Sequence, residues 1–319
     1  MLMKISIRKI IVASLALCAL FLLYLIPDNE SLDYELPKDN IEYVYSNISS
    51  VIYLLDSNDY IARTTIRGCD CDTLETAKDI TKGLIIGEEK SNIIPNGFRS
   101  IIPTGTEILD INLENKILTV NFSRELLDIT EKYEEKMIEA LIYTLTSIEG
   151  IDKVIIKVDG EVLERLPNSN KILPTVLDKT YGINKSYDIV STNNIESYTV
   201  YYVSNYNDNM YYVPVTKYIN SNKQDKIKVI IDELSSSPIY ETNLMSYLNS
   251  NVNLIDYTID DKILSLNFND YILNDDTSNK ILEEVIYTIG LSVVDNFNVE
   301  DISILVNNEE VLTINTKEI

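Results

Sequence analysis

The residue types that most often carry chemistry in proteins are scarce in this chain. None of its 319 residues is histidine, which excludes metal sites built on imidazole and catalytic triads that use imidazole as the base. Three cysteines are present. Cys18 lies in an apolar run near the N-terminus, whereas Cys69 and Cys71 stand one residue apart. Thiol chemistry in the body of the chain therefore depends on that pair.

The pair Cys69 and Cys71 is compatible with several kinds of site. Two cysteines this close in sequence can form a small disulfide, a redox pair or half of a metal centre. A tetrahedral zinc centre needs further ligands, and the sequence holds no second cysteine pair. The fourth interpretation is that the two cysteines are incidental or weakly structural. Whether they form a disulfide stays open.

Carboxylates are abundant but follow no catalytic or metal-binding motif. The chain has 50 acidic and 27 basic residues and a formal charge of −23. It contains no calcium loop of the EF-hand type, no Gly-x-Ser-x-Gly and no glycine-rich phosphate loop, and its nine glycines leave little room for one. We therefore predict a protein that is not an enzyme, with no catalytic residue, metal or cofactor. Nucleic acid is excluded as a partner, because a phosphate backbone requires a basic patch.

Tyrosines gather in one stretch that we predict to be a hairpin. The cluster consists of Tyr198, Tyr201, Tyr202, Tyr206, Tyr211 and Tyr212. Aromatic residues are enriched at protein interfaces, and their rings can also stack on sugars. We hypothesise that this hairpin is an interaction surface for a protein partner or for peptidoglycan. The alternative is that the tyrosines only reflect the high strand propensity of the residue.

The stretch from Ile108 to Leu163 is repeated from Leu254 to Leu312. Three pairs of segments align, namely 108–122 with 254–268, 136–145 with 280–289, and 158–163 with 306–312. Self-similarity of this kind indicates one structural module used twice.

Each copy contains the pattern of a hairpin. Apolar and polar residues alternate in 118–122 and in 264–268, which is typical of a half-buried strand. The pairs Glu114-Asn115 and Asp260-Asp261 stand between two such runs and predict tight turns.

A helix and a closing strand follow in each copy. Apolar residues recur at i and i+4 in 137–145 and 281–289, which predicts helices with one wide apolar face. Asp128 with Glu131 predicts a capping box at the start of the first of these helices.

A further hairpin and helix precede each repeat. The predicted elements are strands at 51–55 and 60–65 with a helix at 73–86, and strands at 198–203 and 210–218 with a helix at 223–234. Each module is thus predicted as two strands, a helix, two strands, a helix and a closing strand. The predicted fold class is α+β, with two tandem modules of antiparallel or mixed sheet and two helices each, behind an N-terminal transmembrane helix.

This pattern resembles the GerM domain of sporulation and spore germination proteins. The resemblance is carried by residues 102–109, the strand 116–122, the helix end 143–145 and the turn 158–160. The second copy departs from it, because residues 250–253 replace the Pro-x-Gly-Thr approach and Asn307-Asn308 replace Asp159-Gly160.

What the resemblance implies is a role in endospore formation or germination. The protein would assemble or support an envelope complex between mother cell and forespore. Its partners would be other envelope or sporulation proteins. Self-association is a further expectation, because the family's modules are similar to ring-building folds in which helices of one copy pack on the sheet of the next.

The N-terminus carries the pattern of a membrane anchor. Lys4, Arg8 and Lys9 precede an uncharged run from Ile10 to Ile26, and residues 5–26 together reach the roughly 20 residues that a spanning helix needs. The basic flank predicts a single-pass protein with a cytoplasmic N-terminus and an extracytoplasmic body.

Two other interpretations of this N-terminus are weaker. A lipoprotein modified at Cys18 is disfavoured, because Leu17 stands where a small residue is expected and apolar sequence continues beyond the cysteine. A cleaved signal peptide would need a site of small residues after the run, and none is present.

The expected organisation has five parts. They are 1–27 for the cytoplasmic tip and transmembrane anchor, 28–50 for a spacer, 51–163 for the first GerM-like domain, 164–196 for a linker and 197–319 for the second domain. The linker contains Ile172, Leu173, Val176 and Leu177. A purely flexible linker would lack such residues, so we expect part of it to pack on the first domain.

Overall fold

A computed structural model describes residues 49–89, 93–207, 209–220, 225–236, 243–273 and 280–319. The predicted membrane anchor and almost all of the predicted spacer lie outside these described residues. Within them, no helix combines the length and the apolar character that crossing a membrane would require.

The first module contains two helices and seven strands among the described residues. Its elements are β1 (Ser49–Asp56), β2 (Ile61–Arg67), α2 (Thr73–Gly83), β3 (Phe98–Arg99), β4 (Ile108–Glu114), β5 (Ile117–Phe122), η2 (Arg124–Leu127), α3 (Glu131–Leu145), β6 (Lys153–Val158) and β7 (Glu161–Val162). The connection to the second module adds η3 (Lys179–Tyr181) and β8 (Ser186–Asp188).

The second module repeats this order among its described residues, except that it lacks a counterpart of β3 and adds η5. Its elements are β9 (Ile195–Tyr206), β10 (Asn209–Asn220), α4 (Lys226–Ser235), β11 (Leu254–Asp260), β12 (Ile263–Phe268), η4 (Asp270–Ile272), α5 (Glu283–Asn296), β13 (Asp301–Val306), β14 (Glu309–Asn315) and η5 (Thr316–Glu318). The α+β class and the two helices per module are confirmed, and the closing strand is extended into a hairpin in both copies.

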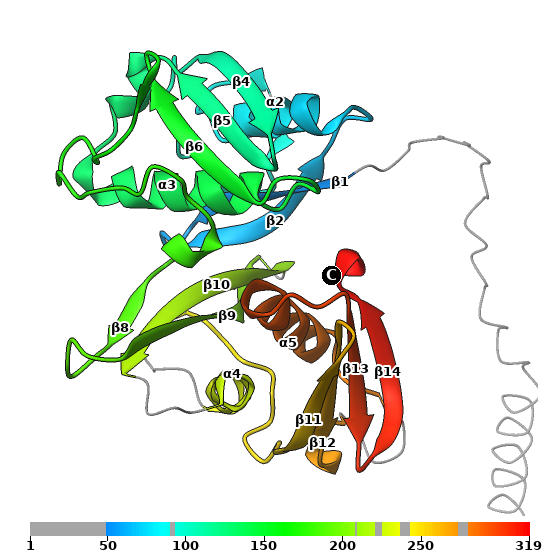
Figure 1. The fold of residues 1–319 in the computed structure, drawn as a ribbon. Coiled ribbons are helices and arrows are strands. Elements are labelled where there is room, and N and C mark those ends of the chain that lie inside the picture. The colour runs from blue at the N-terminus through cyan, green and yellow to red at the C-terminus, as the bar shows by residue number, and fades with distance from the viewer. Residues whose placement is uncertain (1–48, 90–92, 208, 221–224, 237–242, 274–279) are drawn as a thin grey trace, which may run out of the picture. The chain divides into compact units, whose positions relative to one another are not determined.

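Helices α2 and α3 lie between two sheets in the first module, as Figure 1 shows. On one side is the mixed sheet β4-β5-β6-β7, in which β5 and β6 run parallel and the other pairs are antiparallel. On the other side is the hairpin β1-β2. Residues 137–145 of α3 are all buried, because a helix between two sheets needs apolar residues on more than the single face that its period predicted.

The turns of the mixed sheets lie one residue later than the sequence predicted. In β4-β5 the positive φ angles belong to Asn115 (49°) and Lys116 (64°), and in β11-β12 to Asp261 (45°) and Lys262 (74°). Positive φ at both positions is what a two-residue turn of type I′ requires, and this turn matches the twist of its strands. Asn and Asp adopt this conformation with little strain, which explains their place at the first position.

The predicted capping box at Asp128 is wrong. The segment before α3 forms the short helix η2, and Asp128 ends that turn. The residue that precedes α3 is Thr130, in extended conformation and without a side-chain capping bond.

The structure also corrects the alignment of the two repeated helices. The backbone N–H of Tyr53 donates to Thr144 Oγ1 (2.9 Å), and the N–H of Tyr201 donates to Ser292 Oγ (2.9 Å). Thr144 therefore corresponds to Ser292, and not to Thr288, its partner in the sequence alignment. The error equals about one helical turn. The apolar pattern could not reveal it, because that pattern repeats every three to four residues and looks the same after such a shift.

The two modules share one sheet. Its strand order is β3-β1-β2-β10-β8, and β9 pairs with β10 along its whole length. The joint between the modules is the antiparallel contact of β2 with β10, at Arg63 opposite Tyr212. The sequence did not predict this joint. Both outer edges of the hairpins are partly covered, by β3 on β1 and by a bridge from Met245 to Val203 on β9.

Candidate functional site

The predicted tyrosine surface lies mostly inside the molecule. Tyr198, Tyr201, Tyr202 and Tyr211 have at most 6% of their surface exposed, and Tyr206 and Tyr212 are half-buried. The expectation of an exposed stacking platform on this hairpin is therefore corrected. A tyrosine-rich strand pair can be a contact surface without facing solvent, and here its contacts are made within the chain.

Tyrosines of the hairpin meet the first module at successive points. Tyr201 binds Tyr53 through their hydroxyls. The ring of Tyr206 lies against Gly97, where an added Cβ would come within 2.5 Å of it. The contacts of Tyr211 and Tyr212 also reach the first module. The candidate site is thus the interface between the modules.

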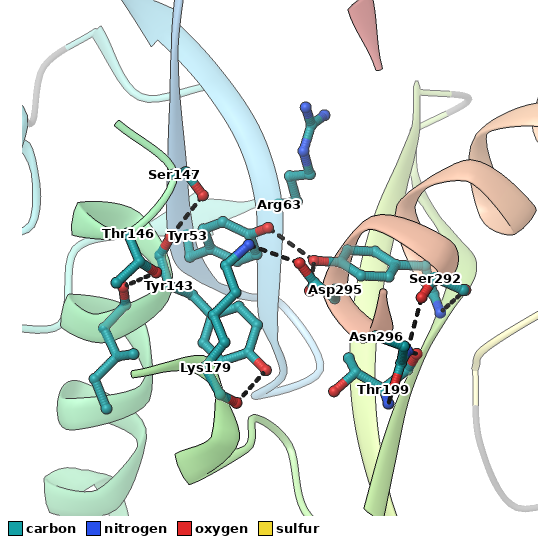
Figure 2. Close-up of polar contacts among 12 residues, drawn as sticks. Tyr53, Arg63, Tyr143, Thr146, Ser147, Lys179, Thr199, Ser292, Asp295 and Asn296 are labelled. Carbon is teal, nitrogen blue, oxygen red and sulfur yellow. Dashed lines mark hydrogen bonds and ion pairs between the residues drawn. The ribbon is translucent and has the colours of Figure 1, made fainter. Parts of the chain in front are cut away.

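A chain of polar contacts crosses the interface at its centre (Figure 2). The hydroxyls of Tyr53 and Tyr201 lie 2.8 Å apart, and Tyr201 donates to Asp295 Oδ2 at 2.6 Å. Because Tyr201 donates to Asp295, Tyr53 must be the donor of the bond between the tyrosines. Lys179 Nζ closes the chain on Asp295 Oδ1 at 2.6 Å. The chain links β1, β9, α5 and η3, which come from both modules and from their connection.

The protonation states in this chain are fixed by burial and by charge. Burial raises the pKa of Tyr201 well above its ordinary value, and the neighbouring Asp295 carboxylate raises it further. Burial also raises the pKa of Tyr53. Burial lowers the pKa of Lys179, but the charge of Asp295, the electrostatic interaction with Tyr53 and the hydrogen bond to Asp295 together raise it, so the net shift is upward. The two phenols therefore stay neutral and Lys179 stays charged, so these side chains form a polar cross-link between the modules.

Neighbouring side chains hold this polar chain in place. The ring of Tyr143 packs edge-on against Tyr53, with centroids 5.4 Å apart, and its hydroxyl donates to the carbonyl oxygen of Lys179 at 3.2 Å. On the other side, Asn296 accepts from the N–H of Thr199 and donates to its carbonyl oxygen. Helix α3 thereby holds the ring of Tyr53 and the backbone of Lys179, and α5 holds the backbone of Thr199, two residues before Tyr201.

Asn184 bridges the two modules where their strands do not pair directly. Its side-chain oxygen accepts from the N–H of Ile61 (2.9 Å), and its amide nitrogen donates to the carbonyl oxygens of Ile61 (2.7 Å) and Pro214 (2.8 Å). The amide therefore replaces a rung between β2 and β10. The backbone of Asn184 has φ of 45°, which Asn tolerates better than most residues.

A buried carboxylate positions Asn184. Glu139 of α3 is 3% exposed and accepts the backbone N–H of Asn184 at 2.9 Å. Burial raises the pKa of Glu139, while the ammonium of Lys185, 3.4 Å away, opposes the shift. Lys185 also binds Glu135 at 2.7 Å and lies over the ring of Tyr181. The linker is thus tied to α3 beside the joint.

A second polar contact lies at the tip of the β1-β2 hairpin. Asp56 is fully buried and accepts the N–H groups of Asn58 and Tyr60, both at 2.8 Å. Its other oxygen accepts the hydroxyl of Tyr211 at 2.8 Å. The ring of Tyr211 also packs edge-on against Phe98. Tyr211 therefore ties the second module to a turn of the first.

The described residues contain no group of three or more His, Cys, Asp or Glu side chains placed to hold a metal ion. A cavity of about 450 Å³ adjoins the interface, and its lining includes Arg63, Lys179, Asp295 and Lys317. Every buried side-chain nitrogen or oxygen in the described part of the chain has a hydrogen-bond partner. The interface therefore already satisfies its own polar groups.

Cys69 and Cys71 form a disulfide in the turn between β2 and α2. This resolves the pairing that the sequence left open. Cys71 is exposed and Cys69 is half-buried, and neither takes part in the contacts between the modules described above.

Sequence reasoning found Tyr201 and missed Tyr53, Lys179, Asn184 and Asp295. One signal for Tyr53 was available, because Val51-Ile52-Tyr53 and Thr199-Val200-Tyr201 hold matching positions in the two predicted hairpins. Lys179, Asn184 and Asp295 carry no local pattern that sets them apart from other polar residues.

Comparison with known proteins gives consistent results. A family model named Germane, described as "Sporulation and spore germination", matches residues 51–164 and 199–312. The spore germination protein GerM of Bacillus subtilis (strain 168) is 30% identical over 275 residues, which cover 84% of this chain and 74% of that protein. The solved tandem GerMN domains of the sporulation protein GerM from Bacillus subtilis superpose with a TM-score of 0.76 at 29% identity, covering 84% of this chain and 93% of that one.

Proposed function

Because this chain belongs to the Germane family of sporulation and spore germination proteins, we propose that it is a non-enzymatic protein that supports an envelope complex between mother cell and forespore. The observation that carries the proposal is the fused pair of modules. Its buried polar groups are all used in holding the described chain together, so what the body offers to partners is its outer surface.

In this proposal residues 5–26 span the membrane and the spacer separates the modules from it. The basic residues before the apolar run keep the N-terminus in the cytoplasm. The body then lies outside the cytoplasm, where disulfides such as Cys69–Cys71 can form.

The interior placement of α3 and α5 restricts how the protein can associate. A contact in which helices of one copy pack on the sheet of another would have to use other surfaces, because residues 137–145 of α3 are buried between the two sheets of their own module. Among the described residues, β4 pairs only with β5, and β11 only with β12. Unpaired strand edges are natural sites for protein association.

The edge β11 has the more apolar exposed surface of the two. Ile255 is 44% exposed and Ile259 is 51% exposed. Both lie on an edge strand, so a partner strand could pair with the backbone and cover these side chains. We propose this edge as the contact with a protein partner of the envelope complex.

The alternative function, recognition of peptidoglycan by the tyrosine hairpin, is not supported by this geometry. Four of its six tyrosines are buried, so sugar rings could not stack on them without opening the interface.

The test uses the full chain in a spore-forming cell that lacks its own copy. The wild type should sediment with the membrane fraction, and protease added outside the cytoplasm should digest its body. It should also restore sporulation or germination. Ile259→Lys should lose function and crosslinked partners, while Val190→Lys should not. Val190 is the matched control because it is 94% exposed and follows β8, which pairs with β10 and not with β11. A cytosolic wild type, or equal behaviour of the two variants, would contradict the proposal.

A further inference from the structure

The Cys69–Cys71 disulfide is placed poorly for a structural role. The two cysteines are separated by a single residue, so the cross-link restricts very little of the unfolded chain, and stabilisation by a disulfide grows with the loop that it closes. Cys71 is exposed. Exposed disulfides are the ones that exchange readily with external thiols.

The start of α2 supplies groups that stabilise a thiolate at this position. Asp72 caps the helix by accepting the N–H of Glu75 at 2.9 Å, so Cys71 directly precedes the helix N-terminus. The N–H groups of the helix N-terminus favour a nearby thiolate and so oppose its repulsion by the Asp70 and Asp72 carboxylates. The hydroxyl of Thr76 lies 3.4 Å from Cys71 Sγ and 3.8 Å from Cys69 Sγ. One hydroxyl can therefore donate to whichever sulfur becomes negatively charged.

We propose that Cys69–Cys71 is a thiol–disulfide exchange site that accepts two electrons from neutral or cationic thiols. A substrate thiolate attacks the exposed Cys71 Sγ, a bond forms between the two sulfurs, and Cys69 leaves as a thiolate that takes up a proton. A second substrate thiolate then attacks the substrate sulfur of this mixed disulfide and releases Cys71 as a thiolate. Two substrate thiols are oxidised to one disulfide, and the protein disulfide is reduced to two thiols.

The preference for neutral or cationic thiols follows from the charges beside the pair. Asp70 lies between the cysteines and Asp72 follows them. A substrate that carries negative charge besides its thiolate is repelled by both carboxylates, whereas an ammonium group carried by the substrate is attracted to them. Among protein substrates, the preferred cysteine is therefore one with a lysine or arginine beside it, because the basic side chain is attracted to the two carboxylates.

The test measures reduction of the full chain carrying Cys18→Ser, so that only the pair reacts. The oxidised protein is treated with cysteamine or with glutathione at equal thiolate concentration, trapped with iodoacetamide and weighed by mass spectrometry. Cysteamine should react about threefold faster or more at low ionic strength, and the ratio should fall toward one in high salt and in Asp70→Asn. The trapped mixed disulfide should be on Cys71.

Three results would overturn the proposal. The first is alkylation of both cysteines in the purified protein without any reductant, which would mean that the disulfide is absent. The second is an equal rate of reduction by cysteamine and by glutathione at low salt. The third concerns the variant Cys69→Ser with Cys71→Ser, which should keep the urea midpoint of the parent. A large fall in that midpoint would show that the cross-link is structural.

Discussion

Tyr53 and Tyr201 hold equivalent positions in the two modules, and their hydroxyls bind each other at 2.8 Å. The equivalent strands β2 and β10 also pair with each other, and they do so antiparallel. Contact between equivalent residues is the mark of a self-complementary interface, as in a twofold dimer. The two modules of this chain thus associate as the halves of such a dimer do, and the contact closes on itself and does not propagate.

Removing one hydroxyl of this pair should destabilise the protein. In Tyr53→Phe the bond to Tyr201 is lost, while Tyr201 keeps Asp295. In Tyr201→Phe, Asp295 keeps only Lys179, and the hydroxyl of Tyr53 is left buried without its partner. We expect the second variant to lose more, about 1–3 kcal/mol of the free energy of unfolding, as measured by urea titration.

A double-mutant cycle tests whether these two effects are coupled. The variant with both substitutions should lose less than the sum of the two single losses, because neither hydroxyl is then left unpaired. Strictly additive losses would show that the hydroxyls do not interact. Tyr287→Phe is the matched control, since no interface contact described above involves its hydroxyl.

Stability should fall in alkaline solution. Burial raises the pKa of Tyr211 and of Tyr212 from 10.0 to about 12. The unfolded chain loses protons from its tyrosines near pH 10, whereas the folded chain keeps them until higher pH. The contribution of these groups is therefore fully present below pH 10 and is lost as the pH rises toward about 12. Urea midpoints at a series of pH values should decline over this window, and a flat profile would contradict the burial.

Asn184 should be essential to the joint between the modules. Asn184→Gly keeps the positive φ but removes the amide, and Asn184→Ala removes the amide and also strains the backbone. Both should destabilise by about 1–3 kcal/mol through unsatisfied groups on Ile61 and Pro214, with Ala the more harmful. Hydrogen exchange should speed up first at the N–H of Ile61. Unchanged protection of this amide in both variants would argue against the bridging role.

Replacing Glu139 by Gln should alter the pH dependence of stability. The raised pKa of Glu139 means that its ionisation disfavours the folded state, so its contribution is fully present below the unfolded pKa and declines as the pH rises through the folded value. Glu139→Gln removes this decline and keeps an acceptor for the N–H of Asn184. The variant should gain stability relative to wild type as the pH rises above about 4.5. A constant difference across this range would contradict the shift.

Sequence reasoning reached the elements of each module and stopped at the contacts between modules. The alternation of Leu118, Val120 and Phe122 is a local signal, and it identified β5 correctly. The pairing of Arg63 with Tyr212 joins segments far apart in the chain, and no local period records it. Shifting a helical sequence by one turn leaves its apolar residues on the same face. Thr144 was therefore matched to the wrong residue of the second helix.

Burial of the tyrosine hairpin was missed for a related physical reason. A phenol ring is compatible with an exposed interface and with an interior that supplies a partner for its hydroxyl. Tyr201 and Tyr211 find such partners in Tyr53, Asp295 and Asp56. These partners became identifiable only when the two modules were seen side by side.

The two modules should unfold as one cooperative unit, and native-state hydrogen exchange at residues 49–319 in rising urea can show whether they do. Amides of β5 in the first module and of β12 in the second should open with the same free energy and the same urea dependence. If the β12 amides opened at clearly lower free energy while β5 stayed protected, the two modules would be independent folding units, contrary to this expectation.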